Sequence, residues 1–500
     1  MFFRQAHMRL TARARYLPIL IVLLVASGFS ARLYAEVAEP EPRGEDEFSF
    51  MKLLDQHGLH DMENERWNAY GQSTFVYNYH PTFSAKYTNF GGSTNSLTPK
   101  AEISFTGTVT GYFGVKLWDG GHVYLAPELI SETPFSSLKG LGSSIQNFEL
   151  QKNGTEQPTI YLSRAYLRQT FGLGGEQIKL ESDPLQLGAT VDSNRLVLTG
   201  GILSVLDVFD KNIYSGDLRQ QFLNMSFLSF AAYDFAADAR GYSFGVVAEY
   251  YFDDWTFRAA RFLPPQNPNQ LDLQWSTLSY YGDQYELEHR HTLFGRKGAV
   301  RLLFFHNHEN MAKFSDAISA YTNSGGAENS TTCPADVFSY GNQNPTAPDL
   351  CWARKPNDKF GGGINLEQAI TDDIGIFFRG MYSDGQSEVY SYTSTDRSIS
   401  LGTLIGGGLW DRKKDLLGLG YSQGWISGIH AQYLGMGGID GFIGDGKITQ
   451  KPEQVMDLFY SYNVWSSLWV SADYQFIAHP AYNADRGPVN VISGRVHVEF

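Results

Sequence analysis

The stretch from Ala101 to Leu117, AEISFTGTVTGYFGVKL, carries the strongest structural signal in the chain. Its odd positions are apolar residues or glycine, and its even positions are mostly Glu, Ser and Thr. Alternation with period two predicts a strand with one apolar and one polar face. A run of this length exceeds the usual strand of about five or six residues, and it suits a tilted strand that crosses a bilayer. Glu102 would then face a water-filled lumen, together with the serine and threonines that follow it at every second position.

The same alternation recurs along the chain and predicts sixteen strands. An even number is expected when both ends of a single-chain barrel lie on the same side of the membrane. We therefore predict an all-β fold, a transmembrane antiparallel β-barrel of about 16 strands. The predicted strands are 67–79, 101–117, 121–130, 159–171, 194–203, 242–251, 254–262, 284–294, 298–308, 359–370, 374–383, 397–409, 414–422, 454–463, 467–477 and 488–500.

The connections between these strands support a barrel independently. They alternate between short turns, such as 118–120 and 252–253, and long loops, such as 131–158 and 309–358. Outer-membrane barrels have short periplasmic turns and long external loops. The connection 172–193 breaks this order, because it should be short and is not. Either an extra element lies there, or the strand count is wrong by a pair.

The N-terminal part of the chain differs from the rest. Four arginines between Arg4 and Arg15 precede a short apolar core at 16–29, and small residues precede Ala35, which predicts a secretory signal peptide at 1–35. A membrane anchor is the alternative, although the core is short for a bilayer span. Residues 36–66 are acidic and then apolar near helical spacing, which predicts a periplasmic or plug-like segment. The barrel domain would occupy 67–500.

Charge and cysteine content limit the partners and the chemistry. The 500-residue chain has a net charge of −14, and loss of 1–35 would remove five arginines and no acid. Such an acidic protein gains no attraction to a phosphate backbone, so we predict no nucleic-acid partner. Cys333 and Cys351 are the two cysteines of the chain. In an exported protein they are disulfide candidates, and a metal site would need more ligands than these two supply.

The C-terminal segment gives a third indication of a barrel. Phe500 ends the chain, and apolar residues or glycine precede it at every second position back to Ile492. A terminal Phe that closes an alternating strand resembles the signal read by the barrel-assembly machinery of outer membranes. We therefore predict the outer membrane as the location, its lipids as the surroundings and this machinery as a partner. Whether the protein forms a homo-oligomer is left open.

One motif could indicate an enzyme. Residues Gly420 to Gly424 match G-x-S-x-G, but a nucleophile elbow requires a strand, a sharp turn and a helix. The residues that follow, Trp425-Ile426-Ser427-Gly428, show no helical face. We predict no enzymatic activity, no cofactor and no metal site.

The predicted lumen is a better candidate site. In 159–171 the apolar set is Tyr161, Ala165, Leu167 and Phe171, and the opposite set is Arg164, Tyr166 and Arg168. Arg258 and Arg379 also fall on the polar side of their strands. Guanidinium groups and carboxylates can form hydrogen bonds with sugar hydroxyls, and rings such as Tyr166 can stack on the apolar face of a pyranose.

A dense stretch, 204–224, follows the fifth predicted strand and falls in the third external loop. In sixteen-stranded general porins the third loop folds inward and narrows the channel. We select these residues of the loop as candidates to line the pore or contact solute: Asp207, Asp210, Asn212, Asp217 and Arg219.

Several motifs of the chain together resemble the carbohydrate-selective porins of the OprB type. The most distinctive is D-x-F-D-x-N-x-Y-x-x-D-x-R-x-x-F-x-N at 207–224. The resemblance covers roughly 67–500, and it implies a sixteen-stranded barrel and passive uptake of sugars without fixing the sugar. The loop 309–358 has no place in the family pattern. The other matching pieces are YLRQTFGLGG at 166–175, AADARGY at 236–242, EHRHTL at 288–293, NLEQ at 365–368, DYQF at 473–476 and PAYNADRGPV at 480–489.

These observations predict an outer-membrane porin for passive, carbohydrate-selective diffusion of small sugars. A polysaccharide-export barrel or a general diffusion barrel is the alternative within the same class. An outer-membrane hydrolase and a purely structural or adhesive barrel with a plugged lumen are the alternatives from other classes. Channel conductance that responds to added sugars would discriminate among them.

Overall fold

The computed structural model describes residues 49–150, 154–391 and 394–500. The predicted signal peptide at 1–35 lies outside these residues, as does the first part of the segment 36–66. Within the described part of the chain, no helix is long and apolar enough to cross a membrane.

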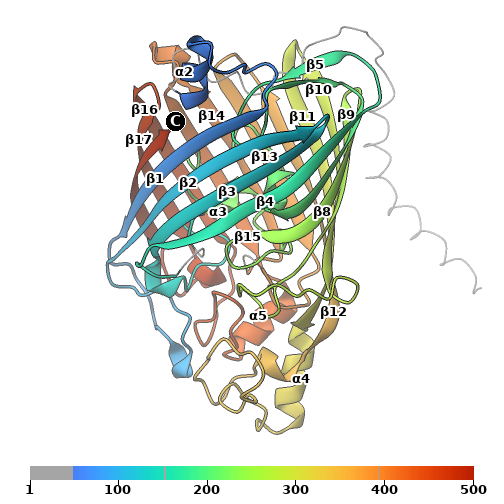
Figure 1. The fold of residues 1–500 in the computed structure, drawn as a ribbon. Helices are drawn as coiled ribbons and strands as arrows, with labels where there is room; N and C mark the ends of the chain where they lie inside the picture. Colours follow the sequence, from blue (N-terminus) through green and yellow to red (C-terminus); the bar gives the residue numbers. More distant parts are fainter. Residues whose placement is uncertain (1–48, 151–153, 392–393) are drawn as a thin grey trace, which may run out of the picture. The chain divides into compact units, whose positions relative to one another are not determined.

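Sixteen strands form one closed antiparallel barrel (Figure 1). Each strand pairs with its neighbour along the chain, and β1 pairs with β18 to close the barrel. The barrel strands are β1 (Trp67–His80), β2 (Glu102–Trp118), β3 (Gly121–Thr133), β4 (Thr159–Gly172), β7 (Arg195–Leu203), β8 (Ser243–Phe252), β9 (Trp255–Phe262), β10 (Tyr281–Leu293), β11 (Arg296–Ala312), β12 (Arg354–Ala369), β13 (Ile374–Ser383), β14 (Arg397–Gly406), β15 (Leu416–Trp425), β16 (Glu453–Trp465), β17 (Leu468–Ala478) and β18 (Val489–Glu499).

All sixteen predicted strands are present, and the long connection 172–193 contains an added element. This element is a hairpin of β5 (Gln177–Leu180) and β6 (Ala189–Asp192), which pair only with each other. The strand count was therefore right. Several strands are longer than predicted at the end of the barrel that carries the long loops. β12, for example, begins at Arg354 instead of 359. Backbone hydrogen bonds between neighbouring strands continue there, although apolar side chains no longer alternate along the sequence. The pattern therefore could not predict these strand ends.

The two faces of β2 follow the predicted alternation. Ile103, Val109 and Phe113 are exposed on the outer surface. Ser104 and the threonines at 106, 108 and 110 are buried on the inner side. At the barrel seam, the backbone of Phe500 exchanges two hydrogen bonds with Gly71, at 2.8 and 2.9 Å. A Cβ at position 71 would lie 2.4 Å from the Phe500 ring, so glycine makes room for that ring.

The prediction for Tyr161 was wrong because β4 contains a bulge. The pairing of β3 with β4 shifts at Ser163, so that Arg164 lies opposite Ala126 and Leu162 opposite Pro127. One extra residue moves the side chains before it to the other face. Ile160 and Leu162 therefore point outward, and Tyr161 points into the barrel, where its hydroxyl donates to Glu128.

Short helices lie in the segments outside the strands. α2 (Phe50–Gln56) precedes the barrel at the end that holds the C terminus, β5 and the short turns, whereas α4 (Phe314–Asn323) and α5 (Gly428–Gly435) lie at the opposite end (Figure 1). α3 (Met225–Leu228) lies in the long connection after β7. The 3-10 turns are η1 (Phe90–Gly92), η2 (Phe135–Ser137), η3 (Val205–Asp207), η4 (Leu350–Trp352), η5 (Gly407–Trp410) and η6 (Pro480–Tyr482).

The long loops pack against one another at the far end of the barrel. A disulfide joins Cys333 to Cys351, with their Cα atoms 6.0 Å apart. His430 of α5 stacks on Phe314 of α4, at 4.2 Å between ring centroids. Its Nδ1 lies 3.1 Å from an Asp396 oxygen, and its Nε2 lies 3.3 Å from an Asp440 oxygen. Burial lowers the pKa of His430, but the two carboxylates outweigh it and raise that pKa to about 9.

Candidate functional site

Two long loops fold into the barrel and fill much of its lumen. We name them L2 (134–150 and 154–158) and L3 (204–242). L2 follows the inner face of β2, where Asn147 donates to Thr106 at 2.9 Å and Thr108 donates to Glu149 at 3.2 Å. L3 begins with η3, which is closed by a capping box: Ser204 accepts from the backbone N–H of Leu206, and Asp207 accepts from the N–H of Ser204.

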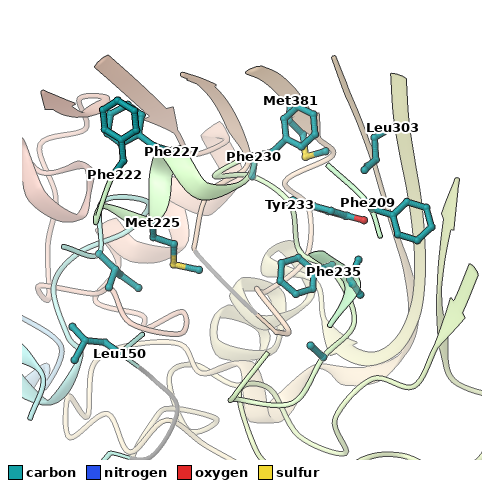
Figure 2. Close-up of a cluster of buried hydrophobic side chains, with 14 of the residues drawn as sticks. Leu150, Phe209, Phe222, Met225, Phe227, Phe230, Tyr233, Phe235, Leu303 and Met381 are labelled. Carbon is teal, nitrogen blue, oxygen red and sulfur yellow. The ribbon is translucent and has the colours of Figure 1, made fainter. Parts of the chain in front are cut away.

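One side of L3 packs on an apolar part of the barrel wall. Figure 2 shows the buried cluster, in which Phe222 and Phe227 of L3 lie side by side, 4.9 Å between centroids. Phe222 also contacts Phe377 of β13 at 5.6 Å and Phe459 of β16 at 5.0 Å. These edge-to-face contacts are the geometry that aromatic rings prefer. They fix L3 to the inner wall on the β11–β17 side.

Buried polar groups strengthen this attachment. Arg379 of β13, which is 1% exposed at its side chain, donates from Nε to Asp210 at 2.9 Å and from Nη1 to the backbone oxygen of Phe227 at 2.6 Å. Asn212 donates to the Asn365 side chain of β12 at 2.8 Å. The prediction that Arg379 lies on the polar face was right. Its role is to hold the loop.

The other side of L3 faces a different wall through charged groups. Asp207 accepts two hydrogen bonds from Arg164 of β4, at 2.7 and 2.6 Å. Arg219 donates to the Tyr112 hydroxyl at 3.0 Å, and its Nη2 lies 3.5 Å from Glu128 and 3.4 Å from Glu149. A bidentate pair fixes orientation as well as charge. The loop thus presents charged side chains to β2, β3 and β4.

Arginine and tyrosine alternate along this second wall. The guanidinium of Arg168 lies over the rings of Tyr124 and Tyr166, at 5.1 and 5.4 Å from their centroids. Similar pairs are Arg164 over Tyr242 at 5.1 Å, Arg195 over Tyr251 at 3.9 Å and Arg240 over Tyr161 at 4.5 Å. These distances are within the range of cation–π attraction.

Arg258 occupies a dense ion-pair network further round the same wall. It contacts Glu249 at 3.1 Å, Glu286 at 2.8 Å and Glu288 at 3.0 Å. Glu288 also accepts from Arg301 at 2.8 Å. Charges buried this deeply need such partners. Arg258 is therefore part of a network in which its positive charge is paired with glutamate carboxylates.

Water reaches several cations between L3 and this wall. The side chains of Arg164 and Arg219 are 15% and 17% exposed, although both lie inside the barrel. Lys211 is exposed, while its neighbours Asp210 and Asn212 are buried against the wall. Lys211 was not selected from the sequence. Lys211 lies within the 207–224 motif, between Asp210 and Asn212. Its position between these two selected residues is the sequence signal that could have identified it as a candidate.

The remaining selected residues fall in three places. Tyr166 is buried under Arg168, and Asp217 is exposed on L3, where it accepts from the backbone of Arg219 at 2.7 Å. Glu102 lies near the long-loop end and accepts from the Ser136 hydroxyl of L2 at 2.8 Å. The G-x-S-x-G residues lie within β15, where Ser422 donates to a strand carbonyl, so no nucleophile elbow forms.

Comparisons with known proteins show the family of the chain and the fold that it shares. The model of the carbohydrate-selective porin family, OprB, matches residues 114–500. The high-pH structure of Pseudomonas putida OprB superposes with a TM-score of 0.62 at 13% identity, covering 90% of this chain and 96% of that one. The low-pH structure gives 0.48 at 10% identity over 92% and 100%. The channel DcaP of Acinetobacter baumannii gives 0.45 at 10% identity over 87% and 97%. No curated protein sequence matches.

Proposed function

Because the chain belongs to the carbohydrate-selective porin family OprB, we propose that sugars cross its lumen between L3 and the wall formed by β2–β9. The protein is an integral outer-membrane β-barrel porin that admits sugars by passive diffusion. Its family and fold indicate a channel. We further propose that the protein catalyses no reaction. We also propose that the barrel-assembly machinery reads the strand that ends at Phe500.

One observation carries the proposed route. The cations that water reaches inside the barrel, Arg164, Arg168, Arg219 and Lys211, all lie on the side of L3 turned away from its aromatic attachment. The aromatic side of L3 is packed against the opposite wall in a cluster of buried apolar side chains. A sugar on this route therefore meets the guanidinium groups of three arginines and the ammonium group of Lys211.

This surface suits neutral sugars chemically. Each guanidinium carries five N–H donors in a planar arrangement, which can bind the hydroxyl oxygens of a pyranose. The tyrosines beneath Arg164 and Arg168 are buried and hold these guanidinium groups in place. Asp210 and Asn212 are omitted from the proposed contact set, because their side chains are already bonded to Arg379 and Asn365.

Conductance in planar bilayers tests the proposal. Added mono- and oligosaccharides should reduce the ion current of the wild-type channel. Arg168→Ala and Arg219→Ala should each weaken this block by about tenfold, as expected when one hydrogen bond to a charged group is lost. Arg397→Ala is the control, because Arg397 stacks on Tyr382 on the outer surface. A wild-type channel insensitive to sugars would refute the proposed route.

A further inference from the structure

A second structural unit lies at the end of the barrel with the short turns. We name it the collar; it comprises residues 49–66 with α2 and residues 173–194 with the β5–β6 hairpin. Glu65 joins its two parts and is 2% exposed. Its carboxylate accepts from Ser182 and from the backbone N–H of Gly188, each at 2.7 Å, and from His60 at 3.0 Å.

The collar enters the lumen instead of lying on the barrel rim. Leu187 is fully buried, and its backbone N–H donates to the Tyr124 hydroxyl of β3 at 3.1 Å. A Cβ at Gly114, on the inner face of β2, would lie 3.2 Å from Leu187. Asn68 of β1 donates to the backbone oxygen of Gln186 at 2.8 Å. The turn 182–188 therefore covers the inner faces of β1, β2 and β3.

The collar also contacts the cations of the proposed sugar route. Arg168 donates from Nη1 to the backbone oxygen of Leu185 at 3.1 Å. Met51 of α2 is fully buried in a cluster with Tyr70 and Tyr112. Tyr112 in turn accepts from Arg219 at 3.0 Å. The collar thus supports, from one end of the barrel, residues that L3 reaches from the other.

We propose that the collar is a second, periplasmic filter in series with L3, and that Glu65 is its positioning residue. The turn 182–188 narrows the periplasmic exit, and its Leu185 carbonyl orients Arg168 toward the passing sugar. Narrow segments in series add their resistances, so loosening the collar raises the conductance even while L3 stays in place. This inference rests on the proposed function, because it assigns part of the sugar route.

A pair of substitutions tests the role of Glu65. Glu65→Ala removes the acceptor that joins the two parts of the collar, whereas Glu63→Ala removes only an exposed pair with Lys179. We expect Glu65→Ala to raise the single-channel conductance and to weaken sugar block by up to about tenfold, the size of one lost charged hydrogen bond. Glu63→Ala should match the wild type in both measurements.

A cysteine variant gives a readout that depends on the side of the membrane and remains available if Glu65→Ala fails to fold. Leu185→Cys introduces a thiol beside Arg168, and the two native cysteines are joined to each other. A negatively charged methanethiosulfonate should reduce the current and the sugar block faster from the periplasmic side than from the outside. Phe294→Cys, in the fully exposed β10–β11 turn, is the control and should leave both unchanged.

The outcomes separate the two proposals. If sugars block the wild type but Glu65→Ala behaves like Glu63→Ala, or if modified Leu185→Cys keeps its current and block, the collar is not a filter. If the wild type forms no channel, or its channel is insensitive to sugars, the proposed function fails first.

Discussion

The two halves of the lumen wall are built from similar strands, but their inward side chains differ in polarity. On the β11–β17 side, inward residues such as Phe377 and Phe459 are apolar and bind the aromatic side of L3. On the β2–β9 side, inward residues such as Arg164 and Arg168 are cationic and partly exposed. The difference teaches that one wall holds L3 by apolar packing, whereas the other wall presents partly exposed charged groups to it.

The same chemistry has different consequences on the two walls. Arg379 and Arg164 each pair with an aspartate of L3, at 2.9 and 2.6 Å. The side chain of Arg379 is 1% exposed, and that of Arg164 is 15% exposed. A buried pair that loses one partner leaves an uncompensated charge, whereas water can solvate a partly exposed one. The exposed fraction of the side chain therefore distinguishes the anchoring arginine, Arg379, from the one that water can reach, Arg164.

The largest effect is expected on the anchoring wall. Arg379→Ala leaves Asp210 buried without its cation, at a cost of about 3–5 kcal/mol. L3 should detach locally, so the channel should become larger and noisier and lose sugar block. Single-channel recording and thermal unfolding measure these changes, with Arg397→Ala as the control on the outer surface. Unchanged conductance and stability would show that the aromatic contacts alone hold L3.

A smaller effect is expected from the solute-facing wall. Lys211→Glu reverses the sign of an exposed charge in the passage without removing an anchor. The channel should become more selective for cations, and the shift should shrink at high salt because screening weakens it. The reversal potential in a salt gradient measures this selectivity. Lys355→Glu, at the long-loop end of β12 beside Asp316, should not change it; an equal shift there would remove Lys211 from the passage.

The smallest effect on the channel is expected from the external loops, remote from both walls. His430 has a pKa raised to about 9, above its ordinary value near 6.5. The stabilisation that it gives is complete below about pH 6.5 and is lost as the pH rises through about 9. Hydrogen exchange in α4 and α5, corrected for its intrinsic pH dependence, should therefore accelerate over this range. His430→Gln should abolish the acceleration; its persistence would implicate another group.

The strands could be predicted from the sequence because alternation is a local property. Tyr161 was misplaced because a single extra residue, Ser163, reverses the faces before it, and a bulge leaves no clear mark in the pattern. Asp210 and Asn212 were grouped with Asp207 because all three share a motif. Which of them faces the wall depends on strands more than a hundred residues away, as the contact of Asp210 with Arg379 shows.

The seam between β1 and β18 has a consequence for how the barrel is made. Thr74 and His497, which form a hydrogen bond across it at 2.7 Å, are separated by 423 positions. The first strand is therefore synthesised long before its partner exists. Until then its edge carries unpaired backbone groups that can template pairing with other chains. Biogenesis must keep this edge protected throughout translation and export, and closure is the step that ends the need for protection.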